Sequence, residues 1–363
     1  NLSGPFKEEE IVMSKLIDSY LLEMEIGQPQ TDGEVTVFPL KSKKNPGPEY
    51  ITLTEALRSG QLTVIEISES GSVPELKAAN QGEKAVLMLD GEELVGARQN
   101  RVLNTTIWVA PGASLLIPVS CVERNRWAGL HRPMEKSDNL MAHSMRLKKV
   151  QSVNKNLEKR AGFRSDQHEV WLEVERASCL LNVNSPTAAL KDIYEGQKTE
   201  LEKYLKAFHL IPGQNGLLVF FAGEPMGCDF LSREKAFGHL FQKLLKSYLL
   251  EVIIAEQNKK NTRQKGKGED HQLKKPAIRT TTTPGIKKAR NFLSKAAQSD
   301  EKRYKAIGSG MSCRYHHKDL AGASLEIDNS IPHFVFLAAE KGSLPGNYRG
   351  RESFLFREGD NLE

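Results

Sequence analysis

Cysteine is scarce in this sequence, and the few cysteines stand far apart. The 363 residues include only Cys121, Cys179, Cys228 and Cys313, and no two of them form a Cys-x-x-Cys pair. This spacing argues against a disulfide framework and against a structural zinc site, so we predict no metal site. Reduced, buried cysteines in a cytoplasmic protein are the expected arrangement.

Long apolar runs are also missing. No run approaches the roughly 20 residues that a membrane-spanning helix needs, and the N-terminal residues lack the basic region and apolar core of a secretory signal. Hydrophobic residues make up 39% and charged residues 27% of the sequence, which is typical of a globular protein. We therefore expect a cytoplasmic protein without a membrane partner.

Familiar catalytic signatures are missing as well. The sequence contains no Gly-x-Ser-x-Gly nucleophile elbow, no phosphate-binding loop and no dinucleotide fingerprint. His316 and His317 are adjacent and would point to opposite faces of a strand, which makes them a poor metal pair. Cys121 is the one candidate cysteine nucleophile, and its expected burial on an apolar face makes it inert. No cofactor follows from these patterns.

Positive charge is concentrated in one segment. Eleven Lys or Arg residues stand against two acids between Lys259 and Arg290, so this segment has a net charge of +9 and the rest of the chain −4, within a total of +5. We expect residues 259–284 to form a basic, flexible insertion. Nucleic-acid binding through this segment is an alternative to a solvated linker, but no aromatic residues are interleaved for base stacking.

Hydrophobic periodicity predicts an α+β fold, with an antiparallel β-meander in each half packed by amphipathic helices in one compact body. Residues 31–338 are expected to form a single domain, or two subdomains at 31–160 and 161–338, between an N-terminal extension (1–30) and a tail (339–363). Strands are expected at 34–40, 62–67, 85–89, 92–97, 101–109, 114–122, 217–222, 226–230, 304–316, 323–327 and 333–338. Helices are expected at 139–157, 166–181, 185–208, 233–256 and 286–297, and residues 16–26 fit either a helix or a strand.

Residues 85–127 form the stretch richest in strand and turn signals. Asp90-Gly91 is a strong signal for a type I′ hairpin turn between the first two of its four strands. Gly96 indicates a bulge or a close approach of two backbones. Polar residues gather at the strand ends, in three groups: Glu92 and Glu93, Gln99 to Arg101, and Glu123 to Trp127. Adjacent antiparallel strands are expected to bring the first two groups together, and whether the third joins them depends on the strand register. We therefore place the candidate functional site at these ends.

The residue types in this cluster suit the recognition of a phosphate-containing ligand. Glu92 and Glu123 are the expected catalytic residues, because a carboxylate can act as a general acid or base. Arginine binds phosphate through two parallel hydrogen bonds, tryptophan stacks on a base or sugar, and side-chain amides bind polar edges. Ion pairs at a solvated sheet end, worth little, are the alternative interpretation. The expected ligand-binding residues are Gln99, Asn100, Arg101, Arg126 and Trp127.

A second candidate lies in the later hairpin that contains Gly223, Glu224, Gly227 and Asp229. Asp229 is of a type that reaches a metal or a ribose hydroxyl. The alternative is that it only caps the turn or the following helix.

Two long runs carry a resemblance to a known family. The runs GEELVGARQNRVLNTTIWV and LLIPVSCVERNRW resemble the signature of the ARG and rhodanese-phosphatase-associated protein domain, first group, and residues 216–248 and 313–338 resemble its later blocks. The resemblance covers about residues 35–338. The matching motif positions are Glu92, Gly96, Gln99, Asn100, Arg101, Cys121, Glu123, Arg126 and Trp127.

The resemblance implies a function by association, because the family is named for its link to ADP-ribosylglycohydrolase-like and rhodanese-phosphatase-like proteins. We therefore predict a nucleotide- or ADP-ribose-directed protein, a hydrolase acting on a phosphate-containing small molecule. A non-catalytic binding or scaffold module and a nucleic-acid-binding protein are the alternatives.

Overall fold

The computed structural model describes residues 15–67, 74–127, 132–265 and 283–339. Over these ranges it has an α+β fold, as the sequence predicts. The helices are α1 (Leu16–Glu23), α2 (Leu53–Arg58), α3 (His143–Glu158), α4 (Gln167–Leu180), α5 (Leu190–Gly196), α6 (Lys198–Leu205), α7 (Glu234–Lys265) and α8 (Ile286–Ala297). The strands are β1 (Glu25–Ile26), β2 (Gln30–Asp32), β3 (Val35–Lys41), β4 (Tyr50–Thr52), β5 (Leu62–Ile65), β6 (Glu75–Asn80), β7 (Ala85–Met88), β8 (Glu92–Val95), β9 (Arg101–Leu103), β10 (Ile107–Val109), β11 (Ser114–Cys121), β12 (Glu135–Leu140), β13 (Gly216–Phe221), β14 (Glu224–Leu231), β15 (Asp300–Lys305), β16 (Met311–His317), β17 (Leu320–Ile327) and β18 (Ser330–Ala338).

The largest sheet is antiparallel and has nine strands. Its order is β1-β3-β13-β14-β18-β17-β16-β15, and β2 also pairs with β3. Two of its hairpins turn on adjacent residues with positive φ, at Ala222-Gly223 and at Asp328-Asn329. Such pairs are characteristic of type I′ turns, which match the twist of the flanking strands. The first of these turns lies at the start of the hairpin predicted from the sequence at Gly223 to Asp229.

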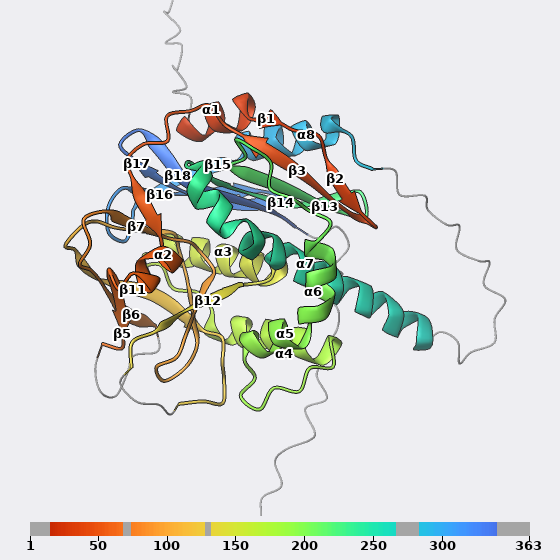
Figure 1. Cartoon of the computed structure of the whole chain (residues 1–363), viewed down its shortest axis with the longest axis horizontal. Helices are drawn as coiled ribbons and strands as arrows, with labels where there is room; N and C mark the ends of the chain where they lie inside the picture. The colour runs from red at the N-terminus through yellow and green to blue at the C-terminus, as the bar shows by residue number, and fades with distance from the viewer. Residues whose placement is uncertain (1–14, 68–73, 128–131, 266–282, 340–363) are drawn as a thin grey trace, which may run out of the picture.

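Helices cover both faces of this sheet (Figure 1). Helices α1 and α8 pack on one face, while α7 and α3 cover the other. The apolar stripe predicted for residues 233–256 is buried in α7, with Phe237, Leu244 and Tyr248 all fully buried. The core under α3 and α7 contains residues from Val35 to Leu337, so both halves of the chain contribute to it.

The two smaller sheets have the orders β10-β7-β4 and β12-β8-β9-β11-β6-β5. Strands β4 and β7 run parallel, in contrast to the antiparallel pairing elsewhere in the described sheets. The chain changes sheets between β7 and β8, and again between β9 and β10. The predicted strand 101–109 is therefore two strands, each belonging to a different sheet.

The prediction of a type I′ hairpin at Asp90-Gly91 is wrong. The backbone N–H of Glu92 donates to the carbonyl of Leu89 at 3.1 Å, and only Gly91 has positive φ, at +84°. This is the pattern of a type II turn, which needs positive φ at its second central residue alone. The turn passes the chain from one sheet to the next instead of pairing β7 with β8.

Several predicted boundaries shift. The segment 185–208 forms two helices that meet at Gln197, and residues 16–26 form α1 followed by β1. The predicted strand 304–316 is divided between β15 and β16, because the chain turns at Gly308 and Gly310, both at positive φ. Helix α7 continues to Lys265, and the remainder of the predicted basic insertion up to residue 282 lies outside the described ranges. No helix in the described ranges is long and apolar enough to cross a membrane.

Candidate functional site

Glu123 and Arg126 hold together the ends of two strands. Arg126 forms a bidentate ion pair with Glu123, in which Nε donates to Oε1 at 2.9 Å and Nη2 donates to Oε2 at 2.7 Å. The backbone N–H of Asn100 donates to the same Oε2 at 3.0 Å, and Arg126 Nη1 donates to the carbonyl of Ala97 at 2.8 Å. These bonds tie the loop between β8 and β9 to the segment that follows β11.

The carboxylate of Glu123 is fully engaged by these contacts. Burial raises the pKa of Glu123, but the hydrogen bonds from Arg126 and from the Asn100 backbone outweigh burial and hold the pKa below its usual range. A carboxylate that stays ionised and has hydrogen bonds on both oxygens is suited to holding the loop in place. It is less suited to moving a proton.

Arg101 is buried beside this loop, with a side chain that is 0% exposed. Its Nη1 donates to Oε1 of Gln99 at 2.9 Å. Nε and Nη2 have no hydrogen-bond partner in the described part of the chain. Nη2 lies 3.7 Å from Oε1 of Glu66, whose side chain is 4% exposed and whose two oxygens also lack hydrogen bonds. Buried polar atoms without partners are rare in proteins, because each costs free energy of folding.

Trp127 lies over this buried pair. The guanidinium carbon of Arg101 is 5.6 Å from the centroid of the Trp127 ring, and that of Arg98 is 5.8 Å away. The indole is nevertheless 42% exposed, an unusual value for a large apolar ring. We name the group of Glu66, Gln99, Arg101 and Trp127 the Arg101 site.

Cys121 adjoins the Arg101 site, because it pairs with Arg101 across β9 and β11. Burial raises the pKa of its thiol to about 11, so the thiol is protonated at neutral pH. Its backbone N–H and carbonyl are both bonded to the side chain of Gln167, at 2.7 and 2.8 Å. The residue therefore acts as buried structure in β11.

Glu92 lies at the opposite end of β8 from this group. Its Oε1 accepts a hydrogen bond from Nζ of Lys243 at 2.7 Å, and its Oε2 accepts one from the backbone N–H of Leu89 at 2.8 Å. Its neighbour Glu93 contacts other partners, Ser137 and Asn139. The structure therefore brings together Gln99, Asn100, Arg101, Glu123, Arg126 and Trp127, and it separates Glu92 from them.

Asp90, one residue before the Gly91 turn position, begins a buried network of charges. Lys149 of α3 donates to Oδ1 of Asp90, and Nη1 of Arg314 lies 4.0 Å from Oδ2. Arg314 also donates from Nη2 to Oγ1 of Thr105 at 2.6 Å. Burial outweighs the attraction of Asp90 and lowers the pKa of both Lys149 and Arg314.

Asp229, from the second predicted candidate, lies in the same interior region. Arg146 donates to its two oxygens at 3.0 and 2.5 Å, and the hydroxyl of Tyr248 donates at 2.7 Å. His333 Nε2 is 3.7 Å from Asp229 Oδ1, while His333 Nδ1 is 2.8 Å from Oγ1 of Thr106. Burial raises the pKa of Asp229, but Arg146 and His333 outweigh it and hold this pKa well below its usual range. We name Asp90, Arg146, Lys149, Asp229, Tyr248, Arg314 and His333 the interior network.

The sequence did not identify most of the interior network. On the predicted helix 139–157, Arg146, Lys148 and Lys149 would form a basic, solvent-facing surface, but Arg146 and Lys149 are each only 1% exposed. Glu66 lies inside the predicted strand 62–67, and alternation places it on the same face as Leu62 and Val64, which are buried. Its charge, which favours exposure, obscures this signal. Among the predicted hairpin residues, only Asp229 joins the network, since Glu224 is at the exposed start of β14.

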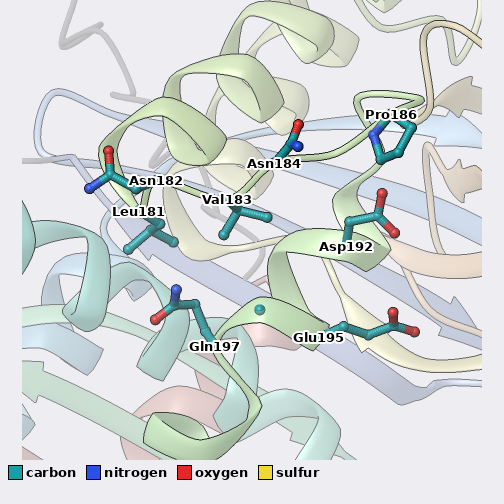
Figure 2. A pocket seen from close by; sticks show the side chains of 9 residues that line it. Leu181, Asn182, Val183, Asn184, Pro186, Asp192, Glu195 and Gln197 are labelled. Atoms are coloured by element: carbon teal, nitrogen blue, oxygen red, sulfur yellow. The ribbon is translucent and has the colours of Figure 1, made fainter.

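Surface depressions occur elsewhere. One of about 490 Å³ lies where the end of α4 meets α5, and Figure 2 shows the side chains of Asn182, Asp192 and Glu195 around it. Asp192 is already hydrogen-bonded to Ser185, which precedes α5. This depression contains none of the predicted site residues.

The fold and the cluster together define an α+β protein with a buried, partly unpaired arginine and carboxylate under an exposed tryptophan. The family model of the ARG and rhodanese-phosphatase-superfamily-associated protein domain matches residues 23–337, so the chain belongs to this family. The resemblance noted in its motifs is thereby confirmed. No curated protein and no solved structure matches the chain.

Proposed function

We propose that this protein binds a phosphate-containing small molecule of the nucleotide or ADP-ribose type in the Arg101 site and hydrolyses it. One observation carries the proposal. Within the described residues, Nε and Nη2 of the buried Arg101 and both oxygens of Glu66 lack hydrogen-bond partners, Nη2 lies 3.7 Å from Glu66 Oε1, and the exposed ring of Trp127 lies over the Arg101 guanidinium.

The two free nitrogens of Arg101 suit an oxyanion. Nε and Nη2 share one edge of the guanidinium plane, and this edge matches two oxygens of a phosphate group. Gln99 holds the third nitrogen, Nη1, at 2.9 Å and so fixes the orientation of the plane. A donor pair that is oriented before binding loses less entropy when the ligand arrives.

Glu66 supplies the reactive carboxylate in this proposal. Its oxygens accept no hydrogen bond in the described part of the chain, and one lies 3.7 Å from Arg101 Nη2. A phosphate bound by Arg101 would therefore lie near a base able to position water. The name of the family, which associates it with a rhodanese-phosphatase superfamily, is consistent with phosphate chemistry.

The remaining residues of the cluster take supporting roles. Trp127 offers an exposed aromatic ring on which a base or sugar can stack. Glu123 and Arg126, with the backbone of Asn100, hold the loop that carries Gln99. Glu92 is predicted from the sequence as a catalytic residue. In this proposal it stabilises the fold through its ion pair with Lys243 at the other end of β8. The cytoplasm, the location expected from the sequence, contains such ligands.

Calorimetric titration with ADP-ribose, AMP and inorganic phosphate tests binding, and release of phosphate or nucleoside phosphate tests turnover. Arg101→Lys keeps the charge but loses the paired donors, so we expect affinity to fall at least tenfold, which is about 1.4 kcal/mol. Arg124→Lys is the matched control, because Arg124 is half-exposed and contacts Trp171 and Glu175. Equal affinity of the wild type and Arg101→Lys would refute the site.

Glu66→Gln separates an enzyme from a binding module. We expect this substitution to abolish turnover while ligand affinity stays within a fewfold of the wild type. If the wild type binds ligand but releases no product from any of these compounds, the hydrolase part of the proposal fails and the binding module remains.

A further inference from the structure

Three potential metal ligands lie together on the outer strands of the large sheet. Glu301 of β15, Cys313 of β16 and Glu326 of β17 each offer one ligand atom, and these atoms all lie within 4.8 Å of one another. Within the described ranges, no other three His, Cys, Asp or Glu side chains meet in this way. None of the three belongs to the Arg101 site or to the interior network.

Strand register explains why residues so far apart in sequence meet here. Glu301 pairs with Tyr315 and Glu326 pairs with Met311, which are the positions two residues to either side of Cys313. Because side chains two residues apart share a face of a sheet, both glutamates are diagonal neighbours of Cys313 on one face. Sequence spacing alone does not reveal this arrangement.

The group is buried and carries an excess of negative charge. The side chains of Glu301 and Glu326 are 9% and 8% exposed, and Cys313 is fully buried. Arg303 pairs with both glutamates, donating from Nη1 to Glu301 Oε1 at 3.2 Å and from Nη2 to Glu326 Oε2. One guanidinium thus faces two carboxylates.

Glu301 keeps one acceptor unused. Its Oε2 is buried and has no hydrogen-bond partner among the residues that the structure describes, whereas its Oε1 accepts from Arg303. A buried carboxylate oxygen without a donor costs free energy of folding unless something else compensates it. The side chain of Arg303 is 45% exposed, so it can move toward solvent without opening the core.

We propose that Glu301, Cys313 and Glu326 form a site for a divalent cation of the zinc class. A thiolate and two carboxylates suit this borderline ion, while magnesium and calcium prefer oxygen ligands alone. On binding, the S–H bond of Cys313 is replaced by a sulfur–metal bond, and the proton passes to solvent. Two carboxylates, a thiolate, the cation and Arg303 then sum to zero charge.

Without a cation the thiol stays protonated. Burial, followed by the nearby carboxylates, raises the pKa of Cys313 to about 12. Metal binding is therefore expected to release about one proton per chain near neutral pH.

Cobalt(II) titration of the metal-stripped full chain tests the site. We expect one equivalent to bind with a near-ultraviolet thiolate-to-cobalt absorption band, and zinc to displace it. Cys313→Ser should remove the band and weaken binding at least tenfold. Cys179→Ser and Cys228→Ser are matched controls, one for an exposed thiol and one for a buried thiol on the same sheet, and both should leave the band unchanged.

Two further variants keep the test decisive if Cys313→Ser does not fold. Glu326→Gln should weaken cobalt binding at least tenfold, while Arg303→Met should tighten it severalfold by removing a competing cation. No cobalt band in the folded wild type, a band that persists in Cys313→Ser, or a band lost in Cys179→Ser would each overturn the proposal and leave Arg303 as an ordinary ion-pair partner.

Discussion

Asp229 of the interior network and Arg101, which lie toward opposite ends of strand β8, are held in different ways. The interior network includes Asp90, which lies just before β8. In this network the carboxylate of Asp229 contacts Arg146, Tyr248 and His333, and every one of these contacts is buried. In the Arg101 site, beyond the other end of β8, two nitrogens of the buried Arg101 guanidinium have no hydrogen bonds within the described ranges. Both regions are charged, but only the second leaves polar atoms beside an exposed aromatic ring.

This difference separates stability from binding. A buried ion pair with good hydrogen bonds offsets its own desolvation, and the loss of one partner leaves a buried charge without compensation. An unpartnered donor does not stabilise the fold and is free to bind a ligand. We therefore expect substitutions in the interior network to lower the free energy of unfolding, and substitutions in the Arg101 site to lower ligand affinity.

The largest effect is expected at Asp229. Asp229→Asn keeps the size of the side chain but leaves Arg146 buried without its ion-pair partner, so the free energy of unfolding should fall by about 3–5 kcal/mol. Tyr248→Phe removes a single hydrogen bond to the same carboxylate and should cost about 1 kcal/mol. Urea unfolding measures both.

If Asp229→Asn and Tyr248→Phe lower the free energy of unfolding equally, the stability contributed by Asp229 does not depend on its ion pair with Arg146. Ligand affinity measured on the folded fraction should change little in Tyr248→Phe, since this residue lies outside the Arg101 site.

Neighbouring glutamates provide the second contrast. Glu92→Gln removes the charge that compensates Lys243 and should cost about 2–3 kcal/mol. Glu93→Gln should be neutral or stabilising at pH 8, because burial raises the pKa of Glu93 and its ionisation opposes folding. The stability contributed by a raised carboxyl pKa is present below the unfolded pKa, about 4.3, and is lost as pH rises through the folded pKa.

The advantage of Glu93→Gln over the wild type should therefore shrink as the pH is lowered from 8 toward 5. Unfolding free energies of the two proteins at both pH values measure this change, and an advantage that grows at low pH would contradict it.

Sequence patterns predicted the parts of the molecule that depend on local periodicity. The apolar stripe of α7 and the bounds of α8 follow directly from helical spacing. The cluster of Asn100, Glu123 and Arg126 follows only in part. The sequence places these residues at strand ends, but whether the ends meet depends on the strand register, in which Cys121 pairs with Arg101. Glu92, expected beside Gln99–Arg101, instead contacts Lys243 at the other end of β8.

The interior network does not follow from local patterns. Arg146 and Asp229 are 83 residues apart, and Lys149 and Asp90 are 59 apart. A helical position with a cationic side chain is normally exposed, and only the tertiary partner shows that this one is buried. The break within 101–109 likewise depends on tertiary contacts, since the side chain of Asn104 donates to the carbonyl of Phe163.

Glu123 tests whether the loop at the Arg101 site depends on charge. Glu123→Gln should cost about 1–2 kcal/mol at pH 7, because Arg126 loses an ionised partner. The pKa of Glu123 is held low in the folded state, so its contribution is present above the unfolded pKa, about 4.3, and is lost as pH falls through the lower folded pKa. The difference between variant and wild type should therefore narrow below about pH 4.

Ligand affinity and turnover in Glu123→Gln distinguish a structural role of Glu123 from a catalytic one. If the residue only holds the loop, affinity should fall by a small factor and turnover should persist at saturating ligand. Complete loss of turnover with unchanged affinity would instead make Glu123 a catalytic residue.

The smallest effect is expected at the two glycine turns. Gly91 and Gly223 have φ of +84° and +79°, so an alanine strains the backbone by about 1 kcal/mol at either position. A Cβ at Gly91 would lie 3.5 Å from Cγ of Arg146, while at Gly223 the nearest atom is Nζ of Lys288 at 3.9 Å. Calorimetric unfolding of Gly91→Ala and Gly223→Ala separates backbone strain from disturbance of the interior network. Only the methyl group added at Gly91 would contact a member of this network, Arg146. Equal losses would mean that Arg146 accommodates the methyl group without weakening its pair with Asp229.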